Sequence, residues 1–212
     1  MGVSKEIPFY SNTPENVRCV QACLRMILKH LLDREFSWQE LDDLTQSGPD
    51  EVTSPAAALV GMTKLGLQAT LVADFDHLRF SEEGIDYVRH THGDEVANWQ
   101  LANGNVEKSR ALSRDLFSSS VLYEHRTPKL EYVNQLLEQG YGVFCGVNSR
   151  IINNKEGYSG HSVVMLGLDD TTVKIHDPGL PPKPHLEVPI QKFTDAWESH
   201  GANVRAVRLP EE

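Results

Sequence analysis

Two of the three cysteines in this 212-residue sequence, Cys19 and Cys23, lie four residues apart in the stretch NVRCVQACLRMILKHLL. Apolar residues recur there at three- and four-residue spacing, which predicts a helix over Val17–Leu31 with Cys23 on its buried face. Cys19 falls in the first turn, where unpaired backbone N–H groups, the helix dipole and the neighbouring Arg18 favour a thiolate. We therefore expect a reactive thiol at Cys19, whereas Cys23 and Cys145 are expected to be small buried residues.

A reactive thiol needs a base, and the base needs a group that orients it. His161 opens the predicted strand GHSVVMLGLDD, and Asp177 ends the next predicted strand, in VKIHDPG. A turn over Leu168–Thr172 would pair these strands as an antiparallel hairpin and bring residues 161 and 177 side by side. Taken singly, the histidine also fits a hydrogen-bonded strand edge, and the aspartate a turn before proline. Together with Cys19 they make a Cys-His-Asp triad possible, in that chain order.

Several helices and strands would position these residues. Capping residues and periodicity predict a helix at Ser37–Leu44, with Ser37 and Glu40 as a capping box. A second predicted helix spans Ser54–Leu65, with Pro55 in the first turn and Gly66 as the stop. A third lies in TPKLEYVNQLLEQGYG, with Thr127 as cap, Pro128 first and Gly140 as the stop. The stretch GLQATLVADF alternates like a strand, whereas Asp76–Ser120 is polar, rich in histidine and weakly periodic, so only helix and loop are assigned there.

Short β-rich runs bounded by Gly, Asp and Pro follow from Gly142 onward: GVFCGVN, HSVVMLGLD, TTVKIHDP and NVRAVRL. Helices therefore come first and an antiparallel sheet later, which is typical of the α+β class. We expect a single domain over residues 1–212, because this length suffices for one sizeable core.

Composition restricts the partners and the compartment. The formal net charge is −10 and no run of Lys and Arg occurs, which disfavours nucleic acid and anionic membranes as partners. Nowhere do about 18 consecutive apolar residues occur, so no membrane span is expected, and MGVSKEIPFYSNTP lacks the apolar core of a signal peptide. A cytoplasmic location is the simplest expectation. Three cysteines are also too few for a disulfide framework.

Taken together, these segments resemble the papain-like cysteine peptidases, and most closely the bacteriocin-leader-processing (double-glycine) peptidases, family thirty-nine of the cysteine peptidases, with their free-standing relatives. GHSVVMLGLDD and VKIHDPG match the His and Asp segments of that family, and VNQLLEQGYGVFCGV resembles the helix and strand before them. The resemblance leaves residues 74–126 unaccounted for. The family's start motif reads roughly Asp-Cys-Gly-x-Ala-Cys-Leu-x-Met, and RCVQACLRM matches it at Cys19, Ala22, Cys23, Leu24 and Met26.

The resemblance implies a papain-like fold in which Cys19 is the nucleophile, His161 the general base and Asp177 the residue that orients the base. It implies hydrolysis of a peptide or other amide bond through a thioester, with a peptide or amide-containing substrate and no cofactor.

The family also uses an amide side chain ahead of the cysteine to bind the oxyanion. Asn12 is the nearest match to the usual Gln, and Asn16 is the weaker choice. One such donor supplies about 3 kcal/mol, and the Cys19 backbone N–H would be the second donor. Arg18 and Val20 depart from the family's common Asp and Gly, and the valine side chain would crowd a substrate.

Three alternatives remain beside the hydrolase. Cys19 and Cys23 share a helix face and could bind zinc with histidines, but structural zinc sites usually need a second pair, and only Cys145 is left. HTH at His90–His92 and the histidine at position 176 do not complete such a site. A catalytically inactive member of the fold could bind a peptide without cleaving it. An acyltransferase would use the same triad and differ only in what resolves the thioester.

Overall fold

The computed structural model describes residues 6–48 and 51–211, so the expectation about the N-terminal stretch falls partly outside the described residues. The described part of the chain forms nine helices and seven strands. In chain order these are α1 (Cys19–Leu32), α2 (Trp38–Thr45), α3 (Pro55–Lys64), β1 (Gln68–Ala73), α4 (His77–Glu83), α5 (Ile85–Asn103), α6 (Val106–Ser118), β2 (Leu122–His125), α7 (Leu130–Glu138), β3 (Gly142–Asn148), α8 (Ser149–Ile152), β4 (Gly160–Leu168), β5 (Thr172–Asp177), β6 (Lys183–Pro189), α9 (Ile190–Glu198) and β7 (Asn203–Arg208).

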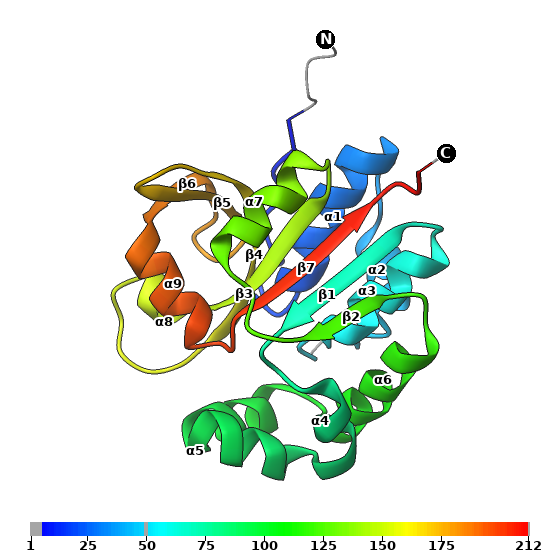
Figure 1. The fold of residues 1–212 in the computed structure, drawn as a ribbon, viewed down its shortest axis with the longest axis vertical. Coiled ribbons are helices and arrows are strands. Elements are labelled where there is room, and N and C mark those ends of the chain that lie inside the picture. The colour runs from blue at the N-terminus through cyan, green and yellow to red at the C-terminus, as the bar shows by residue number, and fades with distance from the viewer. Residues whose placement is uncertain (1–5, 49–50, 212) are drawn as a thin grey trace.

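One mixed sheet contains all of these strands, in the order β2-β1-β7-β3-β4-β5-β6 (Figure 1). The prediction of an α+β fold with helices first and most of the sheet later is confirmed. The expectation of a purely antiparallel sheet is wrong for one pair, because β2 runs parallel to β1. The chain leaves β1, passes through α4, α5 and α6, and re-enters the sheet edge in the same direction, which is what a long crossover connection permits.

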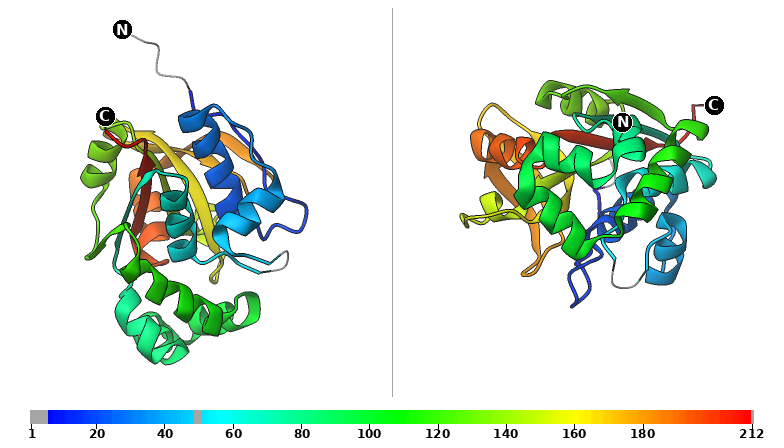
Figure 2. Two further views of the ribbon diagram at one scale, coloured as in Figure 1. Left: turned by 90° about the vertical axis from the view of Figure 1, so that its right-hand side faces the viewer. Right: turned by 90° about the horizontal axis from the view of Figure 1, so that it is seen from below.

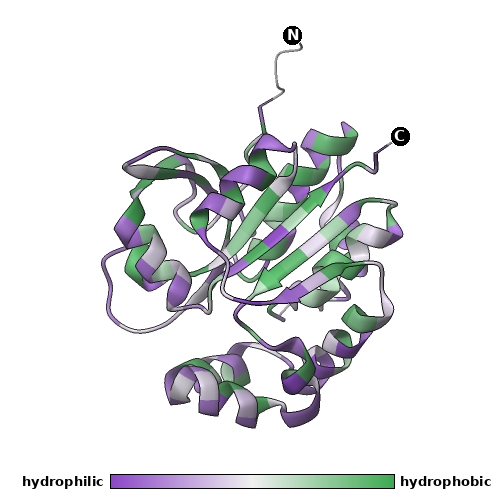
Figure 3. Ribbon diagram, in the orientation of Figure 1, coloured by the Kyte–Doolittle hydropathy of each residue, from purple (hydrophilic) through white to green (hydrophobic). Residues whose placement is uncertain are grey.

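Helices cover both faces of the sheet, so its central strands are buried on both sides (Figures 1 and 2). Helices α1, α2 and α3 pack on one face around a core that includes Leu24, Leu59 and Phe144. Helices α7 and α9 pack on the other face around a second core that includes Val133 and Phe193. Every residue of β3 is buried, and apolar residues follow the central strands in Figure 3.

The segment that the sequence left as helix and loop is mostly helical. Helices α4, α5 and α6 form a lobe at one end of the sheet, with a small core of Phe80, Tyr87, Val88 and Ala97 (Figure 1). Only three of the 19 residues of α5 are buried, which explains why its sequence shows so little periodicity. Gly93 interrupts α5 with φ 86°, a backbone conformation that favours glycine.

Capping chemistry was predicted correctly for α2 and α3. Ser37 accepts a hydrogen bond from the Glu40 backbone N–H, and the Glu40 carboxylate accepts one from the Ser37 N–H, so the predicted capping box is present. Pro55 is the first residue of α3, and Gly66 beyond its end has φ 81°. These local signals are reliable because they satisfy backbone groups that the helix itself leaves unpaired.

The predicted start of α7 is wrong by two residues. The helix begins at Leu130 with Lys129 as its N-cap residue, rather than at the predicted Thr127 and Pro128. The Thr127 hydroxyl donates to Asp74 at 2.9 Å, so it fastens the loop to the end of β1 instead of capping the helix. A tertiary hydrogen bond has therefore replaced the local one.

Candidate active site

The Cys19 thiol lies at the N-terminus of α1, which begins at this residue rather than at the predicted Val17. The residue is 6% exposed. No side chain caps the helix, and no acidic residue lies in its first turn. The backbone N–H groups and the positive end of the helix dipole therefore face the thiol without a competing anion from the helix itself.

Arg18 does not act as the sequence suggested. Its guanidinium binds the Asp42 carboxylate, with Nε at 3.2 Å from Oδ1 and Nη2 at 3.0 Å from Oδ2. Gln21 donates to the same carboxylate at 3.2 Å. The charge of Arg18 is thus balanced by Asp42 and joins α1 to α2, which corrects the expectation that it serves the thiolate.

The predicted hairpin is confirmed. Strands β4 and β5 pair antiparallel, with Val164 opposite His176 and a bulge between Met165 and Gly167. At the turn, Asp169 Oδ1 accepts hydrogen bonds from the backbone N–H groups of residues 171 and 172, both at 2.8 Å. These bonds hold the pKa of the Asp169 carboxyl down, at about 2, and fix the register of the two strands.

This register brings His161 and Asp177 together at the far end of the hairpin. His161 Nε2 lies 2.7 Å from Asp177 Oδ1, and both side chains are buried. The same carboxylate oxygen accepts a hydrogen bond from the Gly179 N–H at 2.8 Å. Gly179 sits so close that a Cβ there would lie 2.9 Å from Asp177 Oδ1 and 3.2 Å from His161 Nε2.

The segment before α1 is attached to the segment after β5. The Asn12 N–H donates to the Pro178 carbonyl at 2.8 Å, and His176 Nε2 lies 3.1 Å from the Ile7 carbonyl. His176 also accepts a hydrogen bond from the His185 N–H, so both of its ring nitrogens are used within the fold. These contacts fix the start of α1 relative to Asp177, although about 160 residues separate Cys19 from that aspartate.

Cys19 and His161 are in hydrogen-bond contact, and each shifts the pKa of the other. Burial raises the pKa of the Cys19 thiol, but hydrogen bonds from His161 and Ser162 and the charge of His161 bring it below its ordinary value. Burial disfavours charge on His161, but Asp177 and Cys19 raise the pKa of its ring to about 10. Both shifts favour a thiolate beside an imidazolium over a neutral thiol beside a neutral ring.

The ring has a definite orientation in this arrangement. Because Nε2 is bound to Asp177, the nitrogen left to face Cys19 is Nδ1. Burial raises the pKa of Asp177, whereas its bond to His161 and the Gly179 N–H lower it below the ordinary value, so the carboxylate is charged. Asp177 can therefore hold the ring while Nδ1 exchanges a proton with the thiol.

Asn12 lies beside this site and organises the turn before Cys19. Its Oδ1 accepts hydrogen bonds from the Thr13 N–H at 2.9 Å and from the Arg18 N–H at 3.1 Å. Its amide nitrogen donates to Asn16 Oδ1 at 3.0 Å and has a second hydrogen to donate. The two candidate amides thus contact each other, and the oxyanion role of either one stays a prediction.

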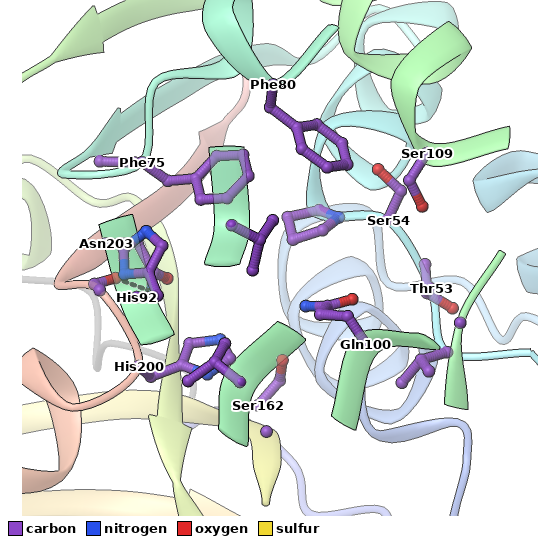
Figure 4. A pocket seen from close by; sticks show the side chains of 18 of the residues that line it. Thr53, Ser54, Phe75, Phe80, His92, Gln100, Ser109, Ser162, His200 and Asn203 are labelled. Carbon is purple, nitrogen blue, oxygen red and sulfur yellow. Dashed lines mark hydrogen bonds between the residues drawn. The ribbon is translucent and has the colours of Figure 1, made fainter. Parts of the chain in front are cut away.

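A cavity of about 140 Å³ opens beside Cys19 and His161, between the sheet and the α4–α6 lobe. In Figure 4, Phe80 from α4, His92 and Gln100 from α5, Ser162 from β4 and His200 converge on it. Val20, which replaces the glycine of the resembled motif, lines the cavity as well. The 74–126 segment therefore supplies much of the wall beside the thiol.

Ser162 and Arg205 are among the polar residues of this cavity that sequence reasoning missed. Ser162 follows His161 directly and is 3% exposed, and its hydrogen bonds to Cys19 help to lower the thiol pKa. Arg205 is also 3% exposed. In NVRAVRL an arginine between apolar residues looks like the solvent face of a half-buried strand, and only the central position of β7 reverses that interpretation.

The other two cysteines belong to the packed interior. Cys23, a residue of α1, is fully buried in the core between that helix and the sheet, and Cys145 is fully buried in the core of the opposite face. Burial raises the pKa of both thiols, that of Cys145 to about 12. Among the described residues no group of three or more His, Cys, Asp or Glu side chains is arranged to hold a metal ion. Within the same residues, no helix is both long and apolar enough to cross a membrane.

The sequence matches no known protein-family profile, and no curated protein matches it. Among solved structures, the chain is similar to a crystal structure from Bacillus anthracis described as that of a candidate C39-like peptidase. The identity is 16% and the TM-score 0.49, over 97% of this chain and 96% of that chain.

Proposed function

We propose that this chain is a single papain-like domain that hydrolyses a peptide or other amide bond through a thioester on Cys19. His161 is the general base and acid. Asp177 orients the His161 ring and favours its protonated form. The observation that carries this proposal is the buried chain of contacts from Asp177 through His161 to Cys19, which ends at an uncapped helix N-terminus beside a cavity.

The reaction follows from the charges in the site. The Cys19 thiolate attacks the carbonyl carbon, and the oxygen that becomes negative accepts hydrogen bonds from the Cys19 N–H and, as predicted, from Asn12. When the C–N bond breaks, the leaving amine takes the proton from His161 Nδ1. His161 then removes a proton from water, and the hydroxide displaces the thiolate from the thioester and releases the acid. An amine or alcohol in place of water would make the same site an acyltransferase.

Selective alkylation of Cys19 tests the proposal without knowledge of the substrate. Iodoacetamide should label Cys19 at pH 6 faster than it labels N-acetylcysteine, because the Cys19 pKa is lowered and that of a free thiol is not. Peptide mapping assigns the label. Cys23→Ala is the matched control: it removes the neighbouring thiol on the same helix and should leave the labelling rate of Cys19 unchanged.

Two outcomes would contradict the proposal. If Cys19 reacts no faster than the free thiol, the site is not an activated nucleophile, and a non-catalytic peptide-binding module becomes the better interpretation. If an amidase activity of the wild-type protein survives in Cys19→Ala, another residue carries out the chemistry.

A further inference from the structure

Arg205 is a buried cation in the middle of the sheet. It lies on β7, opposite Leu71 of β1 and Phe144 of β3 in the strand register, and its guanidinium carbon is 5.5 Å from the centre of the Phe144 ring. Its Nη1 donates to Ser162 Oγ at 3.2 Å, whereas its Nε is buried without a hydrogen-bond partner. The charge is therefore enclosed by apolar strands and incompletely hydrogen-bonded.

No acidic side chain compensates this charge within the part of the chain that the structure describes. The neighbouring groups that favour the charged form of Arg205 are thiols and a phenol, from Cys145, Cys19, Cys23 and Tyr158, and burial lowers its pKa. Arg18, by contrast, has the Asp42 carboxylate at 3.0 Å. A buried charge without a counter-charge destabilises a fold, so its presence here needs a reason outside stability.

The position of Arg205 supplies that reason, because it shares a cavity with the reactive thiol. Ser162 links the two residues: its hydroxyl accepts from Arg205, and the same residue is hydrogen-bonded to Cys19. His92 also lines the cavity, and its Nε2 is buried without a partner. A space of about 140 Å³ is several times what one water needs, so it admits a group of a few heavy atoms.

We propose that Arg205 binds a carboxylate of the substrate and thereby directs Cys19 to amides that carry an acid group close to the scissile bond. This inference rests on the proposed function and specifies its substrate class. A planar guanidinium pairs well with a carboxylate, and both partners are desolvated in the cavity, where their attraction is strong. The net charge of −10 repels anions at long range, so selection of an acid group has to come from such a local contact.

A competing role for Arg205 is that of a counter-charge for the Cys19 thiolate. The two roles separate when two alkylating reagents are compared on the same thiol. Iodoacetate and iodoacetamide both transfer a two-carbon group to sulfur and release iodide, and they differ in carrying a carboxylate or an amide. Any effect on the thiolate cancels in the ratio of the two labelling rates. The ratio therefore reports only how well the site binds the carboxylate of the reagent.

The experiment measures the ratio of iodoacetate to iodoacetamide labelling of Cys19, with N-acetylcysteine as reference. We expect a ratio about ten-fold above the reference, the size of one charge-assisted hydrogen bond, and its return to the reference in Arg205→Gln. Arg208→Gln is the matched control, because it removes one charge from the same strand. Arg208 donates a hydrogen bond to Gln68 and does not line the cavity, so Arg208→Gln should leave the ratio unchanged.

A second measurement does not depend on Cys19 or on the folding of Arg205→Gln. In Cys19→Ala, succinamate should raise the melting temperature more than succinamide does, because the two compounds differ only by a carboxylate in place of an amide. Arg205→Lys keeps the charge without the planar fork and should weaken this difference.

The outcomes are distinguishable. Rapid labelling of Cys19 with a ratio equal to the reference overturns the inference and leaves the proposed function standing. Slow labelling by both reagents contradicts the proposed function, and the succinamate comparison then decides whether Arg205 still receives a carboxylate. Equal shifts in melting temperature with succinamate and succinamide overturn the inference that Arg205 binds a carboxylate.

Discussion

Asp177→Asn removes the charge that holds the His161 ring while keeping the size of the side chain. The bond that it alters joins His161 Nε2 to Asp177 Oδ1 over 2.7 Å in a buried setting. A hydrogen bond between charged groups contributes about 1.5–3 kcal/mol, and one pKa unit corresponds to about 1.36 kcal/mol. We therefore expect the pKa of His161 to fall from about 10 by roughly one to two units.

The measurement is an NMR titration of the His161 ring in protein whose Cys19 thiol has not been alkylated. The variant His161→Gln assigns the ring signal. The upper pKa of the coupled thiol and imidazole pair is the quantity to compare between the wild-type protein and the variant. Asp170→Asn is the control, because this aspartate is exposed at the hairpin turn and its charge lies far along the strands from His161. A folded Asp177→Asn protein whose His161 pKa lies within about 0.3 units of the wild-type value would refute the reasoning.

The same change has a signed effect on stability. The pKa of His161 is raised on folding, so its contribution is complete below the unfolded value of about 6.5 and is lost as the pH rises through about 10. The pKa of Asp177 is lowered on folding, so its contribution is present above about pH 4 and is lost in more acidic solution. The stability difference between wild type and Asp177→Asn should therefore be largest between about pH 4 and 6.5 and shrink on both sides.

Three further substitutions test the supports of the site. Gly179→Ala should slow alkylation of Cys19 about ten-fold, because the new Cβ would lie 2.9 Å from Asp177 Oδ1 and must displace the orienting carboxylate. Arg18→Met should lower the free energy of unfolding by about 2–4 kcal/mol, because it leaves Asp42 buried without its cation, yet it should leave the thiol pKa unchanged. Ser37→Ala should cost about 1 kcal/mol in urea unfolding through loss of the α2 cap and should not affect alkylation.

Each of these predictions has its own control. Gly167→Ala adds a Cβ that meets nothing within 4 Å and should alkylate at the wild-type rate. If it does not, the slower alkylation of Gly179→Ala cannot be attributed to displacement of Asp177. For Arg18→Met, a rise in the thiol pKa would restore the role in thiolate stabilisation that the structure removes. For Ser37→Ala, the unchanged Asn105 cap of α6 provides an internal reference, since its side chain accepts from the Lys108 N–H in the same way.

The sequence was informative where structure is local. Helix α1, the capping box of α2 and the hairpin that brings residue 161 to residue 177 all depend on contacts within a few residues or on a single turn. The parallel strand β2 could not be foreseen, because its four residues have little apolar content and gain their place by pairing with β1. Arg18 and Thr127 were misjudged for the same reason, since partners distant in the sequence, Asp42 and Asp74, determine where these side chains lie.

For the candidate site, residue types and chain order led to Cys19, His161 and Asp177 as candidates, but they did not reveal the surroundings of the thiol. Ser162 and Arg205 acquire their importance from burial, and the burial of Arg205 follows from strand order rather than from its neighbours in sequence. A pattern of alternating residues states which side chains share a face, and it does not state whether that face meets water or another layer.

Strand β7 follows the other described strands in sequence, yet it lies in the middle of the sheet. Strand β7 joins β1 on one side and β3 on the other, so it connects a two-stranded piece to a four-stranded piece. During synthesis, both pieces present unpaired inner edges until β7 is complete, and unpaired edges invite pairing with other chains. The emerging protein therefore depends on β7 for protection from aggregation, and deleting this one strand would be far more damaging than deleting an edge strand of equal length.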